Sequence, residues 1–327
     1  MSGTLRFLSA ADVARALPMK AAVDAVRDAF VQLSNREADV PLRTTMELAG
    51  DGSALVMPVH LPGQHRLGIK VITVVPDNPA RGLPTTQALV VVFDATTGSA
   101  EAVMDGEVLT AVRTGAASGV ATDVLARADS AVVAVIGGGA QGRRQLEGVC
   151  AVRAIREALI YDADQESALR FADEMGELLG FPVRVLHDVA GVQEADVLCT
   201  ATSSNEPVVR DRDIAPGTHI NAIGTFRPDT REIPGATVAR SRLVVDSRKA
   251  CLAEAGDLVL AVQEGLLDAD DPPDEIGEVV AGKAPGRRDE EQVTLFKSVG
   301  NAVQDLAVAI VVLEEAKKMG LGTEVTL

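Results

Sequence analysis

Three glycines, Gly137, Gly139 and Gly142, form the pattern G-x-G-x-x-G between an apolar run at residues 131–136 and an expected helix at 141–152. Glycines at this spacing allow a tight turn and a close approach of the backbone to a pyrophosphate, and the N-terminus of the helix offers free N–H groups to the same ligand. The pattern alone has little specificity, but a strand before it and a helix after it are the context that it requires. The sequence therefore predicts a dinucleotide-binding site.

An acidic residue stands where the adenosine ribose of such a cofactor is expected. Asp162 follows the next expected strand, at 157–161, and lies 20 residues after Gly142 (162 − 142). An acid at this place typically accepts hydrogen bonds from the ribose 2′-hydroxyl and repels a 2′-phosphate. No arginine follows within the next few positions. NAD(H) is therefore the favoured cofactor, with NADP(H) as the alternative because neighbouring loops can override this preference.

Three cationic residues in the first part of the chain are candidates for binding an anion: Arg43, Lys70 and Arg113. Lys70 is the most informative, because it interrupts an apolar run at 68–75, where an unpaired charge would be costly. The chain has 31 Lys and Arg against 47 Asp and Glu, a formal net charge of −16. A small anionic substrate would therefore need locally placed cations, and neither nucleic acid nor a membrane surface is an expected partner.

The remaining reactive residue types indicate no second chemistry. Cys150, Cys199 and Cys251 and the four histidines have no metal-ligand spacing, so no metal site is expected. His219 could lie near the cofactor, although a histidine at a strand end more often bonds to a local backbone group. The first residues lack the pattern of a signal peptide and the apolar runs are too short to span a bilayer, which favours a cytoplasmic protein.

Two kinds of secondary structure position these residues. The first part of the chain predicts a helix and a largely antiparallel sheet, with the helix at 21–33 and strands at 54–59, 68–75, 87–93 and 100–104. A helix at 110–126 precedes alternating strands and helices, which indicate a parallel sheet. The strands of this sheet are expected at 131–136, 157–161, 183–186, 196–201, 218–223 and 243–245, and the helices at 141–152 and 165–179. A last helix is expected at 299–318, and residues 268–274 are expected to form an exposed acidic loop.

Several segments in register resemble the ornithine cyclodeaminase/mu-crystallin family. They are Gly68-Ile-Lys-Val-Ile-Thr-Val-Val-Pro-Asp-Asn, Phe93-Asp-Ala-Thr-Thr-Gly, Met104-Asp-Gly, Leu109-Thr-Ala-Val-Arg-Thr-Gly-Ala-Ala-Ser, Gly137-Gly-Gly-Ala-Gln and Phe296-Lys-Ser-Val-Gly-Asn-Ala. The resemblance covers nearly the whole chain and implies an α/β protein. A Rossmann-type doubly wound parallel sheet, at 116–304, would be inserted in an α+β substrate-binding and dimerisation domain formed by 1–115 plus 305–327. It also implies a homodimer.

The resemblance further implies roles for individual residues. The positions that match Arg43, Lys70 and Arg113 surround the substrate carboxylate and the nicotinamide, and they form the catalytic group. The implied substrate pocket contains Met57, Thr85, Phe226 and Val299. The implied cofactor contacts are Thr85, Arg113, Thr114, Gly137, Gly139, Ala140, Gln141, Asp162, Thr202, Asn221, Ile223 and Ser298.

One position departs from the cyclodeaminases, which carry a catalytic Asp shortly after the strand end that matches Asn221-Ala-Ile-Gly. Phe226 occupies that position here, and Asp229 is expected to point elsewhere. The phenyl ring of Phe has no acidic or basic group, so a cyclising deamination is hard to support. The pattern Gly-x-Phe-x-Pro at 224–228 resembles the ketimine reductases of the family, which reduce Δ1-pyrroline-2-carboxylate or Δ1-piperideine-2-carboxylate to L-proline or L-pipecolate.

Three alternatives stay open on the same sequence. The first is an alanine dehydrogenase-like or N-alkyl amino acid dehydrogenase activity on this scaffold. The second is ornithine cyclodeaminase activity, with an acid from another segment in place of the missing Asp. The third belongs to another class, namely a non-catalytic, NAD(P)H-dependent protein that binds a small ligand like mu-crystallin. The favoured hypothesis is that Arg43 and Arg113 hold a substrate carboxylate while Lys70 polarises or protonates the imine nitrogen.

Overall fold

The chain divides into two compact units in a computed structural model that describes residues 4–326. Unit 1 contains the residues up to Arg113 and those from Asn301 onward, and unit 2 contains Thr114–Gly300. Helix α3 (Gly106–Leu125) begins in unit 1 and continues into unit 2. Unit 2 is therefore one continuous segment that interrupts the sequence of unit 1.

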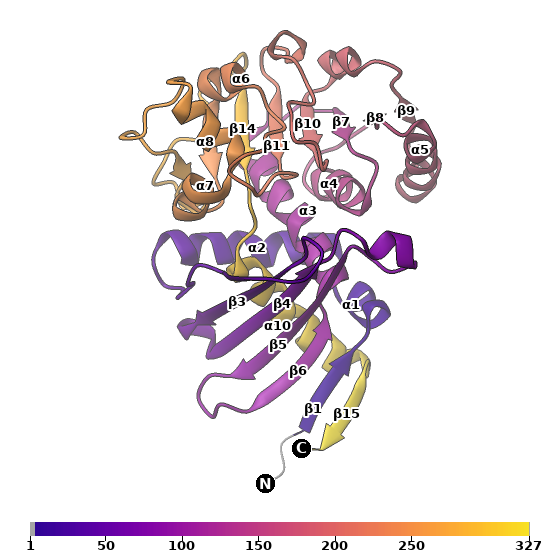
Figure 1. Cartoon of the computed structure of the whole chain (residues 1–327), viewed down its shortest axis with the longest axis vertical. Helices are drawn as coiled ribbons and strands as arrows, with labels where there is room; N and C mark the ends of the chain where they lie inside the picture. The colour runs from indigo at the N-terminus through magenta and orange to yellow at the C-terminus, as the bar shows by residue number, and fades with distance from the viewer. Residues whose placement is uncertain (1–3, 327) are drawn as a thin grey trace. The chain divides into compact units, whose positions relative to one another are not determined.

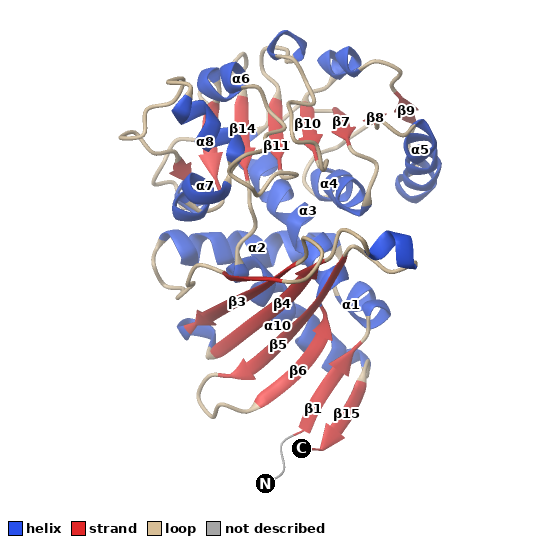
Figure 2. Ribbon diagram, viewed as in Figure 1, coloured by secondary structure: helices blue, strands red, loops and turns tan. Residues whose placement is uncertain are grey.

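Unit 1 is built on a seven-stranded sheet of order β15-β1-β6-β5-β4-β3-β2, in which only the β1–β6 pair is parallel (Figures 1 and 2). The largely antiparallel sheet predicted from the sequence is confirmed. Its strands are β1 (Thr4–Leu8), β2 (Thr44–Glu47), β3 (Ser53–Leu61), β4 (Arg66–Val74), β5 (Thr86–Asp94), β6 (Ala100–Asp105) and β15 (Thr323–Thr326).

Helix α10 (Ala302–Met319) packs along one face of this sheet, against β3, β4 and β5. Its close approach depends on Gly68, because a Cβ there would lie 2.9 Å from the side chain of Leu306. Helix α2 (Met19–Ser34) packs on α10, as does α1 (Ala10–Ala16). The last helix was predicted from 299, but it begins at Ala302 because Asn301 is its N-cap and accepts a hydrogen bond from the Val303 amide.

Unit 2 is built on an eight-stranded parallel sheet of order β13-β12-β14-β11-β10-β7-β8-β9. The chain starts at β7 in the interior, runs outward through β8 and β9, and then returns to β10 and β11 on the other side of β7, which is the Rossmann order for these five strands. The last strand, β14, lies between β11 and β12. The predicted fold class is confirmed. The strands are β7 (Val132–Ile136), β8 (Glu157–Tyr161), β9 (Val183–Val185), β10 (Val197–Thr200), β11 (His219–Ala222), β12 (Arg242–Val245), β13 (Asp274–Glu275) and β14 (Thr294–Lys297).

Helices cover both faces of the parallel sheet (Figure 2). Alternate residues of β7 therefore enter two separate apolar clusters, Ala134 and Ile136 in one and Val133 and Val135 in the other. The helices of unit 2 after α3 are α4 (Ala140–Cys150), α5 (Gln165–Leu179), α6 (Gly235–Arg240), α7 (Arg248–Glu254), α8 (Gly256–Gln263) and α9 (Ile276–Val280). Across residues 4–326, no helix is both long and apolar enough to cross a membrane.

Candidate functional site

The glycine turn after β7 has the geometry that a pyrophosphate site needs. Gly137 has φ +103°, a conformation that side chains disfavour, and a Cβ at Gly142 would overlap the Gly137 carbonyl oxygen. Gly139 is the N-cap of α4 and offers no side chain to cap the helix. The first N–H groups of α4 are therefore presented to a ligand together with the positive end of the helix dipole.

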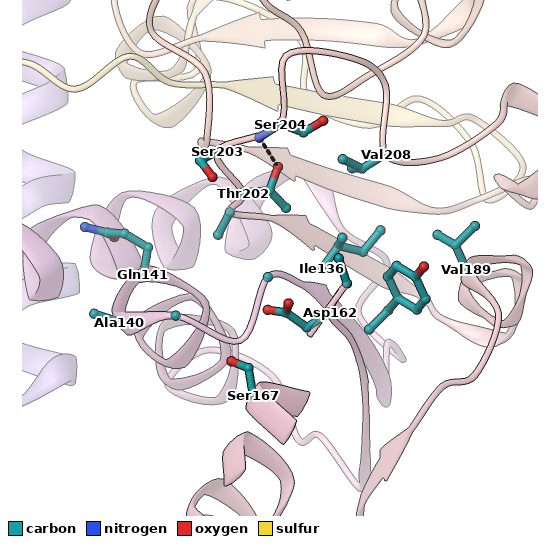
Figure 3. Close-up of a pocket in the computed structure, with 15 residues that line it drawn as sticks. Ile136, Ala140, Gln141, Asp162, Ser167, Val189, Thr202, Ser203, Ser204 and Val208 are labelled. Carbon is teal, nitrogen blue, oxygen red and sulfur yellow. Dashed lines mark hydrogen bonds between the residues drawn. The ribbon is translucent and has the colours of Figure 1, made fainter. Parts of the chain in front are cut away.

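A cavity of about 830 Å³ lies at this turn, beyond the carboxyl ends of β7 and β10 (Figure 3). Its size is that of a typical ligand site. Gln141 points its Oε1 atom into buried surroundings, where no hydrogen-bond partner exists among the described residues. Such an orphaned polar atom fits a bound polar group. The lining residues are Ile136, Gly137, Gly139, Ala140, Gln141, Tyr161, Asp162, Ala163, Ser167, Val189, Ala201, Thr202, Ser203, Ser204 and Val208.

Asp162 closes one side of the cavity next to the glycine turn (Figure 3). Its Oδ2 atom accepts a hydrogen bond of 2.7 Å from the Gly138 amide, and its Oδ1 atom accepts one of 2.9 Å from the Asp164 amide. A carboxylate can accept further bonds, and its charge opposes a 2′-phosphate. The nearby cation Arg143 donates to the Gly138 carbonyl and pairs with Glu174 at 2.6 Å, so it is already engaged.

Other predicted cofactor residues lie at the carboxyl ends of the neighbouring strands but do not line this cavity. Asn221 donates to Thr122 Oγ1 at 3.0 Å, and the Ile223 amide donates to the Thr200 carbonyl at 3.1 Å. Ser298 donates to Asp246 Oδ2 at 2.7 Å. Thr114 is buried on α3. The cavity therefore unites six of the predicted cofactor residues, namely Gly137, Gly139, Ala140, Gln141, Asp162 and Thr202.

A second group of candidate side chains lies in unit 1 around Asp305. The Lys70 ammonium lies 2.7 Å from Asp305 Oδ2, and Arg113 Nε lies 2.9 Å from Asp305 Oδ1. Arg113 Nη1 donates to Gln304 Oε1 at 2.9 Å. All four side chains are buried, so the geometry of both cations is fixed. We refer to Lys70, Arg113, Gln304 and Asp305 as the Asp305 cluster.

Lys70 and Arg113 were predicted from the sequence as site residues, whereas Gln304 and Asp305 were missed. Gln304 and Asp305 lie in the first turn of α10, whose residues 302–313 are otherwise apolar and buried or half-buried. Two polar residues inside an apolar helical stripe are unusual and were the available signal. A buried carboxylate also explains how Lys70 can keep a charge inside the sheet, because a paired charge costs much less to bury than an isolated one.

The electrostatics of the Asp305 cluster make Lys70 a weak base. Burial, together with repulsion from Arg113 and Arg43, lowers the pKa of Lys70 to about 8, although Asp305 pulls it upward. Arg43 itself is half-buried. An ammonium group with a pKa of about 8 is charged at neutral pH and can still release its proton, so it can act as a general acid.

The structure places the predicted substrate-pocket residues in different surroundings. Met57 is buried and pairs directly with Lys70 across β3 and β4, whereas Thr85 is exposed just before β5. Val299 is buried, and Phe226 is 47% exposed in the loop after β11. In that loop the exposed Asp229 carboxylate is held by Arg227 at 2.7 Å.

The remaining titratable candidates are structural. His219 is buried between Thr294 Oγ1 at 2.9 Å and Asn221 Oδ1 at 3.1 Å. Burial lowers the pKa of His219 to about 3, so the ring is neutral. Burial also raises the pKa of the Cys199 thiol to about 12, which keeps it protonated. Within the described part of the chain, no three His, Cys, Asp or Glu side chains gather as a metal site would need.

The chain is similar to known proteins over nearly its whole length. The model of the ornithine cyclodeaminase/mu-crystallin family matches residues 5–320. A Δ1-pyrroline-2-carboxylate reductase of Bacillus cereus is 39% identical over 91% of this chain and 92% of its own. The structure of the Δ1-pyrroline-2-carboxylate reductase of Thermococcus litoralis, in complex with NADH and L-proline, is 41% identical with a TM-score of 0.94, over 98% of this chain and 100% of its own.

An archaeal alanine dehydrogenase, solved as a dimer with bound NAD, is also similar. It is 35% identical with a TM-score of 0.93, over 99% of this chain and 100% of its own. The chain belongs to the ornithine cyclodeaminase/mu-crystallin family.

Proposed function

We propose that this family member catalyses the NADH-dependent reduction of a cyclic ketimine, Δ1-pyrroline-2-carboxylate or Δ1-piperideine-2-carboxylate, to L-proline or L-pipecolate. The observation that carries the proposal is the Asp305 cluster, which holds an ammonium group of pKa about 8 beside a fixed guanidinium group. An imine with an adjacent carboxylate needs these two functions, a proton donor for its nitrogen and a cation for its carboxylate. The similar reductases from Bacillus cereus and Thermococcus litoralis support the substrate class.

Arg43 and Arg113 would bind the substrate carboxylate. A guanidinium group pairs with a carboxylate through two parallel hydrogen bonds, which orients the substrate as well as attracting it. Asp305 and Gln304 hold Arg113 through two of its nitrogens, so little side-chain entropy is lost on binding. Met57 beside Lys70 supplies an apolar contact for the ring of the substrate.

Lys70 would protonate or polarise the imine nitrogen. Bound NADH would supply the hydride that forms the new C–H bond at C2 of the ring. The nitrogen gains the proton that makes the product a secondary amine, and Lys70 recovers its own proton from solvent. This assignment requires no carboxylate at the position of Phe226, where cyclodeaminases carry their catalytic Asp.

NAD(H) is the proposed cofactor in preference to NADP(H). Asp162 opposes a 2′-phosphate at the cavity, and Arg143 is engaged with Glu174 and the Gly138 carbonyl. The residues proposed to contact the cofactor are Thr85, Arg113, Thr114, Gly137, Gly139, Ala140, Gln141, Asp162, Thr202, Asn221, Ile223 and Ser298. A requirement for NADH is also the reason to propose a cytoplasmic location.

We further propose that unit 1 binds the substrate and forms a homodimer. One face of its sheet does not contact α10, and we call it the open face. It carries an apolar row with one residue on each of five paired strands. This row is Pro58, Ile69, Val91, Val103 and Phe7. Beside it Val71 and Leu89 form a cross-strand pair and are 40% and 55% exposed. An exposed apolar face of this extent is typical of a protein interface. The dimer of the similar archaeal alanine dehydrogenase supports a second copy as its partner.

The test is to mix the purified protein with each ketimine and follow the absorbance of NADH, and then of NADPH. We expect rapid oxidation of NADH and a slower oxidation of NADPH. Lys70→Met should abolish turnover and leave the dissociation constant for NADH unchanged, because Met fills the same volume without the charge. Failure to oxidise either cofactor with either ketimine would contradict the proposal, as would a Lys70→Met variant that keeps full turnover.

Alanine dehydrogenase activity is the second candidate. It is favoured by the similarity to the archaeal enzyme, and the Asp305 cluster could hold an acyclic imino acid in the same way. Pyruvate with ammonia and NADH is the matched assay, and L-ornithine with NAD+ tests the cyclodeaminase alternative. A protein that binds NADH but turns over none of these substrates would be a ligand-binding protein.

A further inference from the structure

Glu232 is a buried acid outside both the Asp305 cluster and the lining of the cavity. It lies in the loop between β11 and α6, and its side chain is 0% exposed. Burying a carboxylate is costly unless hydrogen-bond donors or an opposite charge replace the lost water. The contacts that replace the water around Glu232 therefore indicate what the side chain holds in place.

Each carboxylate oxygen of Glu232 accepts two hydrogen bonds. Oε1 accepts from the amide and from the hydroxyl of Thr202, both at 2.7 Å. Oε2 accepts from the Thr200 hydroxyl and from the Gly224 amide, both at 2.8 Å. A Cβ at residue 224 would overlap Oε1, so glycine at this position gives the carboxylate its space.

These four bonds join the carboxyl ends of two adjacent strands. Thr200 is the last residue of β10, and Gly224 follows the end of β11, which pairs with β10 in parallel. Thr202 lines the cavity, and its hydroxyl oxygen accepts a hydrogen bond of 3.2 Å from the amide of Ser204, another lining residue (Figure 3). The contacts of Glu232 therefore continue into the wall of the cavity opposite Asp162.

A second carboxylate and an ammonium group hold Glu232 itself. Asp257 Oδ1 accepts from the amides of Glu232 and Ile233, both at 2.9 Å. Asp257 Oδ2 pairs with the Lys297 ammonium at 2.7 Å, and Lys297 also donates to the Thr225 carbonyl at 2.8 Å. This interaction joins the end of β14 to the same loops, so three neighbouring strand ends share one buried network.

We infer that Glu232 is a positioning residue for the dinucleotide, which holds Thr202 and the segment after it in the conformation that the cofactor requires. This inference rests on the proposed NADH site. It assigns to Glu232 an effect on cofactor affinity that acts through Thr202 and Gly224, without any contact of its own with the ligand. A residue that only stabilises unit 2 would have no such selective effect.

The test compares Glu232→Gln with the wild-type chain. The amide has the same shape, but its NH2 group cannot accept hydrogen bonds, so two of the four donors lose their acceptor. We expect the dissociation constant for NADH, measured by calorimetric titration, to rise about tenfold, since one charge-assisted hydrogen bond is typically worth at least that factor. We also expect faster amide hydrogen exchange at Thr202 and Gly224 in the free protein.

Asp213→Asn is the matched control. Asp213 is also a buried carboxylate of unit 2, where it accepts from Arg210 and lies outside the lining of the cavity. Asp213→Asn should keep the wild-type affinity for NADH even if it lowers the melting temperature as much as Glu232→Gln does. The inference is overturned if Glu232→Gln binds NADH like the wild type, or if Asp213→Asn weakens binding equally. A wild-type chain that binds no NADH would contradict the proposed function instead, while the exchange rates at Thr202 and Gly224 would still decide the positioning role.

Discussion

Lys70 shows how one buried carboxylate can make a lysine useful for chemistry. Without Asp305 the ammonium group would be an isolated charge inside a sheet, and the pKa of Lys70 would be lower still. With Asp305 alone its pKa would be high and it would hold its proton firmly. Burial and the neighbouring Arg113 and Arg43 offset that attraction, and the pKa falls to about 8 instead of 10.5.

The first prediction concerns pH. Lys70 is charged below its pKa, so kcat/KM for ketimine reduction should be highest below about pH 8 and fall as the pH rises through that value. Asp305→Asn removes the attraction that raises the pKa of Lys70, so the falling limb of the profile, where kcat/KM decreases with pH, should move to lower pH.

The free energy of unfolding depends on pH in the opposite direction. Between about pH 8 and 10.5 the unfolded chain binds more protons at Lys70 than the folded chain, so this group makes stability rise with pH there.

The measurement is the pH profile of kcat/KM for the wild type, Asp305→Asn and Asp305→Glu. Asp305→Glu keeps the charge, so its falling limb should stay near that of the wild type. The pH profile of Asp213→Asn serves as the control, because this buried carboxylate of unit 2 is paired with Arg210 and is no part of the cluster, so its variant should keep the falling limb of the wild type. If kcat/KM stays constant up to pH 10, or falls at the same pH in Asp305→Asn as in the wild type, Lys70 is not the proton donor.

At the scale of elements, α3 and α4 pack closely because each has a glycine at their contact. A Cβ at Gly115 would overlap the Arg144 carbonyl oxygen, and one at Gly148 would overlap the carbonyl oxygen of Gly115. Helix α4 begins at the dinucleotide turn, so this contact fixes the helix whose N-terminus faces the cavity. The glycine contact between α3 and α4 thus helps to hold the N-terminus of α4 in position at the cavity.

The second prediction is that Gly148→Ala lowers the free energy of unfolding by about 1–3 kcal/mol, because the added methyl group has no space. Gly176→Ala on α5 is the control, since a Cβ there would meet its nearest neighbour at an ordinary 3.7 Å. That variant should gain roughly 0.5–1 kcal/mol from the better helix propensity of alanine. Denaturant unfolding measures both, and equal midpoints for the two variants would refute the packing argument.

The elements that could be predicted from the sequence are those with a local pattern. The strand at 131–136 and the glycines after it were recognisable because a continuous apolar run and turn chemistry are properties of a short segment. Strand β14 was missed because its four residues, Thr294–Lys297, include two polar side chains that are buried only through contacts with distant segments. Asp305 was missed for the same reason, since its partners lie 192 and more residues away.

At the scale of the whole molecule, charge and apolar surface are distributed unevenly. The chain has a net charge of −16, yet Lys70 and Arg113 share a single buried carboxylate in unit 1. Local positive charge of this kind attracts a small anion that the protein as a whole would repel. The open sheet face of unit 1 is apolar instead, and exposed apolar patches of this kind are typical of interaction sites.

The third prediction is therefore that Leu89→Asp converts a dimer into a monomer. Leu89 is 55% exposed and pairs with Val71 at the centre of the open face. A carboxylate buried there in both copies would lack a partner, and we expect the dissociation constant of the dimer to rise by roughly a hundredfold or more. Sedimentation velocity over a range of protein concentrations measures the change directly.

Leu178→Asp tests whether the effect belongs to this face. Leu178 is 65% exposed on α5 of unit 2, so the same substitution adds the same charge to an even more exposed leucine. It should leave the dimer intact, because α5 packs its buried residues inward on the parallel sheet and carries no comparable apolar row. If both variants stay dimeric, the interface lies elsewhere. If both become monomeric, added charge explains the dissociation and the open face has no special part in it.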